Sequence, residues 1–421
     1  MMSHAVPLTW GIAALTALGV ITRPFRWPEA IWAVAGAVLL VALGLLTLPE
    51  AWEGVGKGLD VYLFLVGMML LSELARREGL FDWLAAIATS RAKGSPVRLF
   101  ALIYIVGTVV TVFLSNDATA VVLTPAVYAA TKAAKVKEPL PYLFICAFIA
   151  NAASFVLPIS NPANLVIFGG GHMPPLGRWL ATFALPSIAA VVSTYVLLYW
   201  TQRRVLLQDS VASNVEAPHL TPTAKLAGAG LVVTALILIG ASAFGLDLGL
   251  PTFVCGLVTA ALIVVVGRES PMETLRAMSW SVLPLVGGLF VVVQALEKTG
   301  LTKILADQLS AGAASAPGQT AAVAGVAVAF LANLVNNLPA GLVAGGAVQA
   351  AHASDTISGA ILIGVDLGPN LSVTGSLATI LWLTALRREG LQVGAFAFLK
   401  LGVVVMVPAL LLSLLALIVL H

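Results

Sequence analysis

Long apolar segments recur along the whole chain, separated by short polar stretches. A run of about 20 apolar residues is long enough to cross the hydrocarbon layer of a bilayer as a helix. The pattern therefore predicts an all-α polytopic membrane protein. The ten predicted crossings lie near residues 5–21, 30–48, 59–75, 139–170, 180–201, 223–243, 251–267, 281–297, 356–386 and 395–420.

Two of these crossings, 139–170 and 356–386, are too long for one regular helix and contain polar stretches with Pro or Gly, so we expect broken helices. Two further apolar stretches, 97–131 and 319–351, each have a polar break in the middle. Irregular backbone at membrane depth is tolerated only where protein or a water-filled cavity surrounds it. We therefore expect two re-entrant helical hairpins with the breaks at their tips.

The second half of the chain repeats landmarks of the first. Asn116-Asp117 aligns with Asn336-Asn337, 220 positions later, and Asn151 aligns with Asp366, 215 positions later. Each half has five crossings, and an odd number turns the second half upside down. Inverted repeats are typical of secondary transporters, which bind substrate at the midplane where broken helices meet. Chance similarity between apolar segments is the alternative explanation.

The repeat divides the chain into three parts. Residues 1–201 form the first repeat, the polar stretch 202–222 is a cytoplasmic linker, and 223–421 form the second repeat. The segments 79–92 and 300–312, one ahead of each hairpin, are amphipathic and are expected to lie flat at the membrane interface.

The basic residues are distributed very unequally between the two sides of this topology. Of 22 Lys and Arg, 18 fall on one side and four, Lys57, Arg178, Lys298 and Lys303, on the other. Cytoplasmic loops carry the excess of basic residues. We therefore expect a multi-pass protein of the bacterial inner membrane with both termini outside. The net charge of +3 reflects this asymmetry and does not indicate a nucleic-acid surface.

Composition narrows the possible functions. The chain has 60% hydrophobic and 10% charged residues, whereas soluble domains have about 25% charged residues. The stretch 54–58 lacks the spacing of a nucleotide-binding loop, the five His are scattered, and no catalytic triad is apparent. We expect neither enzymatic activity nor a cofactor.

Two acidic residues are expected deep in the membrane, Asp117 at the first hairpin tip and Asp366 in the second broken helix. An intramembrane carboxylate costs roughly 2.5–3.5 kcal/mol, so it is a functional candidate by default. Because removal from water favours the protonated form, such a group can load and release a proton. We expect both carboxylates to share one dehydrated cavity and to couple transport to protons. Capping of the hairpin-tip amides is the alternative role.

Amides and hydroxyls in the four breaks are candidate substrate ligands, with packing between helices as the alternative. No Arg or Lys is expected deep in the membrane, so a neutral substrate, or a cation neutralised by the two Asp, fits better than a dicarboxylate. The predicted substrate-binding residues are Ser115, Asn116, Asn151, Ser154, Ser160, Asn161, Asn164, Asn336, Asn337, Asn370, Thr374 and Ser376.

Three stretches, 113–119, 157–165 and 375–382, resemble the bacterial arsenite efflux permeases of the ion transporter superfamily. The resemblance covers nearly the whole chain. It implies export of arsenite and antimonite, with a scaffold domain and a mobile transport domain. The related carboxylate transporters carry Ser-Asn-Thr at both hairpin tips. The tips here, Ser115-Asn116-Asp117 and Asn336-Asn337-Leu338, argue against that branch.

The chemistry is compatible with this resemblance. Arsenite is largely an uncharged trihydroxide at neutral pH, which amides, hydroxyls and backbone groups can bind. A site of three thiolates is impossible, because the chain has only Cys146 and Cys255. Cys146 lies about one turn from Asn151, where it either touches the substrate or packs in the core.

The sequence therefore predicts arsenite or antimonite efflux in exchange for protons, by alternating access. The expected partners are the substrate, protons, the lipid bilayer and a soluble ATPase subunit as an optional addition. A sodium/proton antiporter, in which the same Asp residues bind Na⁺, is the first alternative. A non-transporting membrane protein, such as an anchor or an intramembrane enzyme, is the second.

Overall fold

The computed structural model describes residues 2–168, 173–212, 219–267 and 270–420, and these residues form helices and connecting turns without a strand. Seven of the described helices are long and apolar enough to span a membrane. The number becomes nine if each of two bent helix pairs counts as one span. The prediction of an all-α polytopic membrane protein is confirmed.

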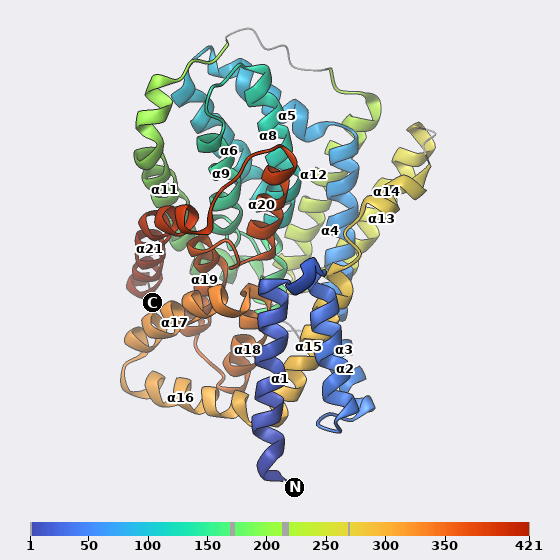
Figure 1. Cartoon of the computed structure of the whole chain (residues 1–421), viewed down its shortest axis with the longest axis vertical. Coiled ribbons are helices and arrows are strands. Elements are labelled where there is room, and N and C mark those ends of the chain that lie inside the picture. Colours follow the sequence, from blue (N-terminus) through green and yellow to red (C-terminus); the bar gives the residue numbers. More distant parts are fainter. Residues whose placement is uncertain (1, 169–172, 213–218, 268–269, 421) are drawn as a thin grey trace.

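The first half of the chain begins with two antiparallel helices and ends with a helix of 33 residues. Between them lie the first hairpin (α6 to α8) and the first broken helix (α9 and α10), as Figure 1 shows. The helices are α1 (Met2–Thr22), α2 (Glu29–Ala42), α3 (Leu48–Lys57), α4 (Leu59–Arg77), α5 (Leu80–Ala92), α6 (Pro96–Phe113), α7 (Asn116–Ala118), α8 (Thr124–Ala133), α9 (Leu140–Ala152), α10 (Pro162–Ile167) and α11 (Leu176–Gln208).

The second half contains a second hairpin, formed by α17 and α18, and a second broken helix, formed by α19 and α20. Its helices are α12 (Pro222–Ala243), α13 (Gly249–Gly267), α14 (Pro271–Ala277), α15 (Val282–Lys298), α16 (Leu301–Ser315), α17 (Pro317–Val335), α18 (Asn337–Ala350), α19 (Asp355–Leu367), α20 (Leu377–Arg388) and α21 (Ala395–Leu420). Short turns complete the chain: η1 (Pro24–Arg26), the π-helical turn η2 (Thr119–Leu123), η3 (Pro158–Ser160) and η4 (Gly368–Leu371).

Some predicted boundaries differ from the structure. The crossing predicted at 30–48 ends at Ala42, because Gly44 adopts a positive φ and starts a turn. A separate helix, α3, follows, and Thr47 and Glu50 cap its start reciprocally. In contrast, α11 continues past the predicted end at 201, where the buried side chain of Leu206 anchors its last turns.

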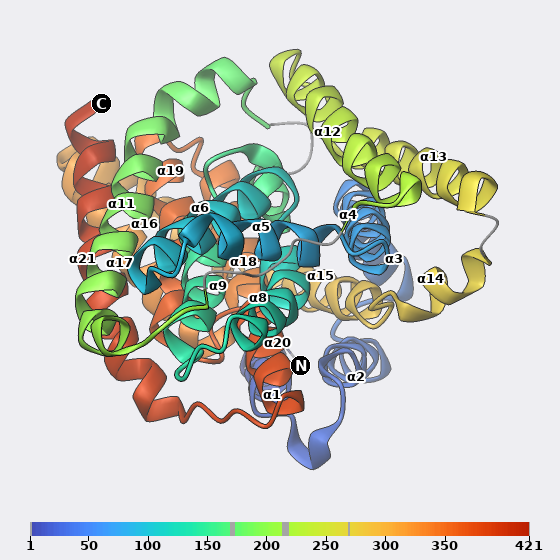
Figure 2. The ribbon, with the colours of Figure 1, turned by 90° about the horizontal axis from the view of Figure 1, so that it is seen from above.

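The helices form two groups that lie side by side when the molecule is seen from above (Figure 2). The edge group consists of α1–α4 and α12–α15, in which α4 packs on α13 and α2 packs on α15. The core group consists of α5–α11 and α16–α21, and it contains both hairpins and both broken helices. The boundary between the groups is therefore where irregular, polar backbone meets regular helices.

The order of elements is the same in both halves. The series α4, α5, hairpin, broken helix, α11 is matched by α15, α16, hairpin, broken helix, α21. In Figure 1, α5 and α8 lie at the top of the molecule and α16 lies at the bottom. This arrangement supports the inverted repeat, which stays a prediction together with the domain limits at 201 and 223.

Small residues allow the helices of the core group to approach closely. A Cβ atom on Gly364 of α19 would clash with the carbonyl oxygen of Gly325 on α17, and one on Gly368 would lie 2.6 Å from Ala329. Without a hydrophobic driving force between helices in lipid, such close packing is a main source of their association. The second hairpin is held against the second broken helix in this way.

We expect the Gly364→Ala variant to be less stable than the wild type by about 1–3 kcal/mol, because the extra methyl group forces α17 and α19 apart. Gly240→Ala is the matched control, since nothing lies within 4 Å of a Cβ at this position in α12. The control should be unchanged or slightly more stable. Thermal unfolding of the purified proteins in detergent measures both, and equal melting temperatures would contradict the role of the glycine contact.

Candidate functional site

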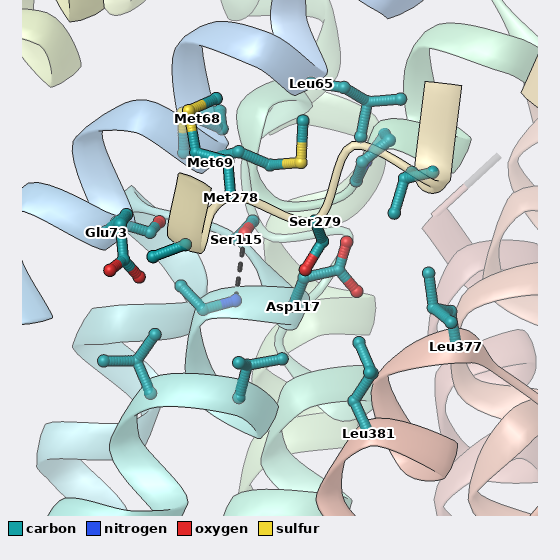
Figure 3. Close-up of a pocket in the computed structure, with 17 residues that line it drawn as sticks. Leu65, Met68, Met69, Glu73, Ser115, Asp117, Met278, Ser279, Leu377 and Leu381 are labelled. Carbon is teal, nitrogen blue, oxygen red and sulfur yellow. Dashed lines mark hydrogen bonds between the residues drawn. The ribbon is translucent and has the colours of Figure 1, made fainter. Parts of the chain in front are cut away.

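A cavity of about 100 Å³ lies at the boundary between the edge group and the core group. The edge group contributes α4 and the connection between α14 and α15, while the core group contributes the first hairpin tip and the start of α20 (Figure 3). Its lining residues are Leu65, Met68, Met69, Ser72, Glu73, Ser115, Asp117, Ala118, Val121, Val122, Pro162, Ala277, Met278, Ser279, Val282, Leu377 and Leu381.

The first hairpin tip presents Asp117 to this cavity. Ser115 Oγ accepts a hydrogen bond from the backbone amide of Ala118 at 3.2 Å, the dashed line in Figure 3. Asn116 Oδ1 accepts one from the amide of Asp117 at 2.9 Å. These two side chains satisfy amides at the start of the short helix α7, so capping does not occupy the Asp117 carboxylate. No donor among the described residues lies within hydrogen-bonding distance of that carboxylate.

The chain beyond the tip is irregular as well. A π-helical turn, Thr119–Leu123, follows α7, and Thr119 Oγ1 lies 2.8 Å from Thr111 Oγ1 on the opposite arm. Both hydroxyls are buried. Isolated π-helical turns occur frequently at functional sites. The pair of hydroxyls holds the two arms of the hairpin together immediately behind Asp117.

Asp366 lies in a different environment, fully buried at the end of α19. Its Oδ1 accepts a hydrogen bond from Asn161 Nδ2 at 2.8 Å. Asn161 directly precedes Pro162, which lines the cavity, but Asp366 is not a lining residue. The expectation that both carboxylates share this cavity was wrong, because Asp366 is fully buried and hydrogen-bonded to Asn161 instead of lining it.

The two broken helices bind each other through amide side chains. Asn151 Nδ2 donates to Asn370 Oδ1 at 2.9 Å and to Thr379 Oγ1 at 3.4 Å. Asn370 Nδ2 donates to the carbonyl oxygen of Phe148 at 2.9 Å. Residues 219 positions apart are thus joined where both helices open. Asn151, Asn161, Asn370 and Asp366 belong to one buried polar region, which lies behind the cavity.

Three other predicted ligands bind backbone groups within the first break. Asn164 Nδ2 lies within hydrogen-bonding distance of the carbonyl oxygens of residues 154, 157 and 158, and Ser154 Oγ donates to the carbonyl oxygen of Asn151. Ser160 Oγ donates to the carbonyl oxygen of Val112 at 2.8 Å and accepts from the amide of Leu157 at 3.2 Å. These contacts hold the irregular backbone in place, since buried polar backbone requires partners.

Three acceptor oxygens in this buried region have no hydrogen-bond partner among the described residues. They are Asp366 Oδ2, Asn151 Oδ1 and Asn164 Oδ1. Each belongs to a side chain with no exposed surface. An unpaired buried acceptor is costly, so this region is suited to a ligand or a proton that supplies a donor or a positive charge.

The second hairpin tip is bound to the second break. Asn336 has a φ of 74° and donates from Nδ2 to the carbonyl oxygen of Thr374 at 3.4 Å. The amide of Asn337 donates to the carbonyl oxygen of Gly375 at 3.0 Å. Ser376 Oγ caps α20 by accepting from the amide of Thr379. None of these residues lines the cavity that contains Asp117.

Sequence reasoning missed several residues of the site. Asn333 Nδ2 donates to the carbonyl oxygen of Gly368, and its Oδ1 accepts from Ser372 Oγ at 2.7 Å. Thr379 joins Asn151 to Ser376. Both could have been found, because Asn333 lies one helical turn before the second tip and Thr379 lies at the capping distance from Ser376. The cavity residues Met68, Met69, Met278 and Glu73 gave no comparable signal. Met68 and Met69 lie in an ordinary apolar helix, Met278 lies in the connection between α14 and α15, and Glu73 lies near the end of a predicted crossing, where acidic residues are common.

Cys146 is fully buried in α9 and is not a lining residue of the cavity, in agreement with core packing. In the described ranges, no three His, Cys, Asp or Glu side chains gather as metal ligands would. Among the described residues that line the cavity, none is Lys or Arg.

Comparison with known proteins places the chain among transporters. Residues 17–365 match the family model described as "Citrate transporter". The "Arsenical pump membrane protein" of Escherichia coli (strain K12) is 31% identical over 84% of each chain, and that of Yersinia enterocolitica is 30% identical over 84% of each chain. The chain belongs to the arsenical pump membrane protein family. The expected membership is thereby confirmed.

The fold is also found in a solved structure. The crystal structure of the Alcanivorax borkumensis YdaH transporter, described as having an unusual topology, has a TM-score of 0.54 with 18% sequence identity. The likeness covers 88% of this chain and 86% of that one. This member of the arsenical pump membrane protein family thus shares a fold with a transporter of very different sequence.

We expect Ser160→Ala to lower the free energy of unfolding by about 1–3 kcal/mol, because it leaves the buried carbonyl of Val112 without its donor. Ser242→Ala is the control, since the buried hydroxyl of Ser242 has no hydrogen-bond partner. Its removal should be neutral or stabilising. Thermal unfolding in detergent again provides the measurement. A Ser160 variant as stable as the Ser242 variant would show that the hydroxyl does not hold the break.

Proposed function

We propose that this protein exports arsenite and antimonite, as neutral trihydroxides, in exchange for protons. The observation that carries the proposal is the Asp117 carboxylate, which faces a cavity between the two helix groups and has no partner among the described residues. The family membership supports arsenicals as substrates, since the relatives from Escherichia coli and Yersinia enterocolitica are described as arsenical pumps.

The lining of the cavity fits a neutral trihydroxide better than citrate. A tricarboxylate requires cationic or strongly donating groups, as Arg does through paired N–H donors. The polar side chains around the cavity are instead hydroxyls and carboxylates: Ser72, Ser115, Ser279, Glu73 and Asp117. These groups accept hydrogen bonds from the hydroxyls of the substrate, whereas the carboxylates would repel an anion.

Competition between a proton and the substrate for the Asp117 carboxylate would couple substrate export to proton import. When ionised, its carboxylate accepts hydrogen bonds from substrate hydroxyls; when protonated, it loses most of this capacity. Proton binding from the outer side would thus release the substrate there, and proton loss on the cytoplasmic side would restore the site. Each inward proton supplies roughly 2.3 kcal/mol per 100 mV of membrane potential.

A second cavity supports alternating access. It lies between the same helix groups but involves the opposite ends of α4 and α15, and it includes Lys57, Gln294 and Glu297 together with residues of α10 and α18. Lys57 Nζ lies 2.6 Å from Gln294 Oε1 and 3.0 Å from Glu297 Oε2. We propose that the first cavity serves the cytoplasmic side and the second the outer side, with the core group moving against the edge group.

Asp366 is the second proposed proton carrier. It is linked to the cavity between the two helix groups, because its partner Asn161 directly precedes the cavity residue Pro162. The proposed roles of the amides around it are to bind substrate or to hold the breaks open. The inner-membrane location and outer position of both termini remain predictions from the basic residues. A soluble ATPase subunit is a predicted optional partner that this mechanism does not require.

We expect Asp117→Asn to reduce arsenite accumulation driven by a pH gradient by about tenfold or more, because the coupling free energy between proton and substrate is lost. Asp366→Asn is expected to act in the same direction. The measurement is arsenite uptake into everted vesicles without ATP. Asp307→Asn, at an exposed position on α16, is the control and should behave as the wild type.

The same vesicles separate the alternatives. The three unpaired buried oxygens near Asp366 favour a cation as a second candidate ligand, so Na⁺-dependent proton movement without an arsenite response would support a sodium/proton antiporter. Unchanged arsenite resistance of cells that carry both Asp variants would instead support a non-transporting protein.

A further inference from the structure

The cavity at Asp117 has one wall rich in thioether sulfur. Three of the eight Met of the chain line it: Met68 and Met69 on α4, and Met278 in the connection between α14 and α15. All three belong to the edge group. In Figure 3 they gather on the side of the pocket formed by α4, whereas Ser115 and Asp117 come from the hairpin tip. Met68 and Met278 are only 5% and 6% exposed.

The cavity therefore has two faces of different chemistry. The hairpin tip offers the Asp117 carboxylate and the Ser115 hydroxyl. The facing wall offers polarisable sulfur with apolar neighbours such as Leu65 and Val282, and it also carries Ser72, Glu73 and Ser279. A trihydroxide of arsenic or antimony has two faces as well. It is a pyramid with three hydroxyls on one side and the bare metalloid atom, with its lone pair, on the other. Hydroxyls directed at Asp117 leave the metalloid atom directed at the thioethers.

Thioethers suit a transporter better than thiols at this position. A thiol can lose its proton and form a metalloid–sulfur bond with release of water, which would retain the substrate. A thioether has no such proton and is only a weak acceptor, so its contact with the metalloid is reversible. The thiol of Cys146 is buried in α9, away from the cavity lining.

We infer that the sulfur atoms of this wall, above all those of Met68 and Met278, determine selectivity among trivalent metalloids and favour antimonite over arsenite. Antimony is larger and more polarisable than arsenic, so its attraction to sulfur across the cavity is stronger. The inference rests on the proposed function, because it assigns a preference within the substrate class proposed for the same cavity.

The test replaces sulfur by carbon at nearly constant volume, in Met68→Leu, Met278→Leu and the double variant. Swaps between Met and Leu are tolerated well in packed interiors. Initial rates of antimonite and arsenite uptake are measured in everted vesicles with the same pH gradient. Met406→Leu is the control, since Met406 is fully buried in α21 and is not a lining residue of the cavity.

We expect the ratio of antimonite to arsenite uptake to fall about twofold to tenfold in the double variant, the size of effect that thioether contacts with another polarisable partner, the aromatic ring, have. Arsenite uptake itself and the Met406 control should change little. Stabilisation of the purified protein against heat by antimonite should fall in parallel. This second readout uses the single variants, so the inference stays testable even if the double variant does not fold.

An unchanged ratio in all variants would overturn the inference, and so would an equal loss of both uptakes, which would indicate packing alone. These outcomes differ from failure of the proposed function. In that case, the wild type would transport neither metalloid, and the selectivity of the variants would have no meaning.

Discussion

Backbone that leaves the helical geometry inside a membrane must find its hydrogen-bond partners within the protein. This protein has four such places, the two hairpin tips and the two breaks, and the core group is built around them. The first break is supported by Asn164, which binds backbone carbonyls within it, and by Ser160, which donates to the carbonyl oxygen of Val112 in the first hairpin. The second break is supported by Asn333, which donates to the carbonyl oxygen of Gly368, and by the second hairpin tip, where the amide of Asn337 donates to the carbonyl oxygen of Gly375. The irregular segments are therefore mutually dependent.

This dependence explains why amides predominate in the buried region. An amide side chain both donates and accepts, so one Asn can join two segments through two bonds. Asn370 of the second break accepts from Asn151 and donates to the carbonyl oxygen of Phe148, both at the end of α9. Most of the polar side chains are occupied in this way. Among the candidate ligands, three buried oxygens without a partner among the described residues stand out from this background: Asp366 Oδ2, Asn151 Oδ1 and Asn164 Oδ1. The Asp117 carboxylate, which faces the cavity, stands out as well. We expect substrate or proton binding at these oxygens, because they are not needed to hold the irregular backbone.

The boundary between the two helix groups places these polar segments opposite regular, apolar helices. The edge group supplies sulfur and alkyl surface from α4 and the connection before α15, together with the Glu73 carboxylate, while the core group supplies the Asp117 carboxylate. A site formed between two bodies changes its access when one body moves, which is how many transporters with broken helices work. The two cavities at opposite ends of α4 and α15 are consistent with such a motion.

The sequence alone determined the all-α membrane class, the positions of both hairpins and both broken helices, and the residue types at their tips. These features depend on local properties, namely the length of apolar runs and the presence of Asn, Pro and Gly within them. It also placed Asp117 and Asp366 among the functional candidates, because charge is rare within apolar segments.

Only the tertiary structure decided which of these residues meet. The contact between Asn161 and Asp366 spans 205 positions. Asp366 is thereby held in the buried polar region, whereas Asp117 faces the cavity that both carboxylates were expected to share. The Met wall is likewise assembled from α4 and the connection before α15, and within its own segment each Met is an ordinary apolar residue. Apolar patterning shows that a helix is buried but not which side chains it meets. The partner of a given side chain depends on how distant helices pack. Small residues such as Gly364 and Gly325 control this packing, because they allow two helices to approach closely.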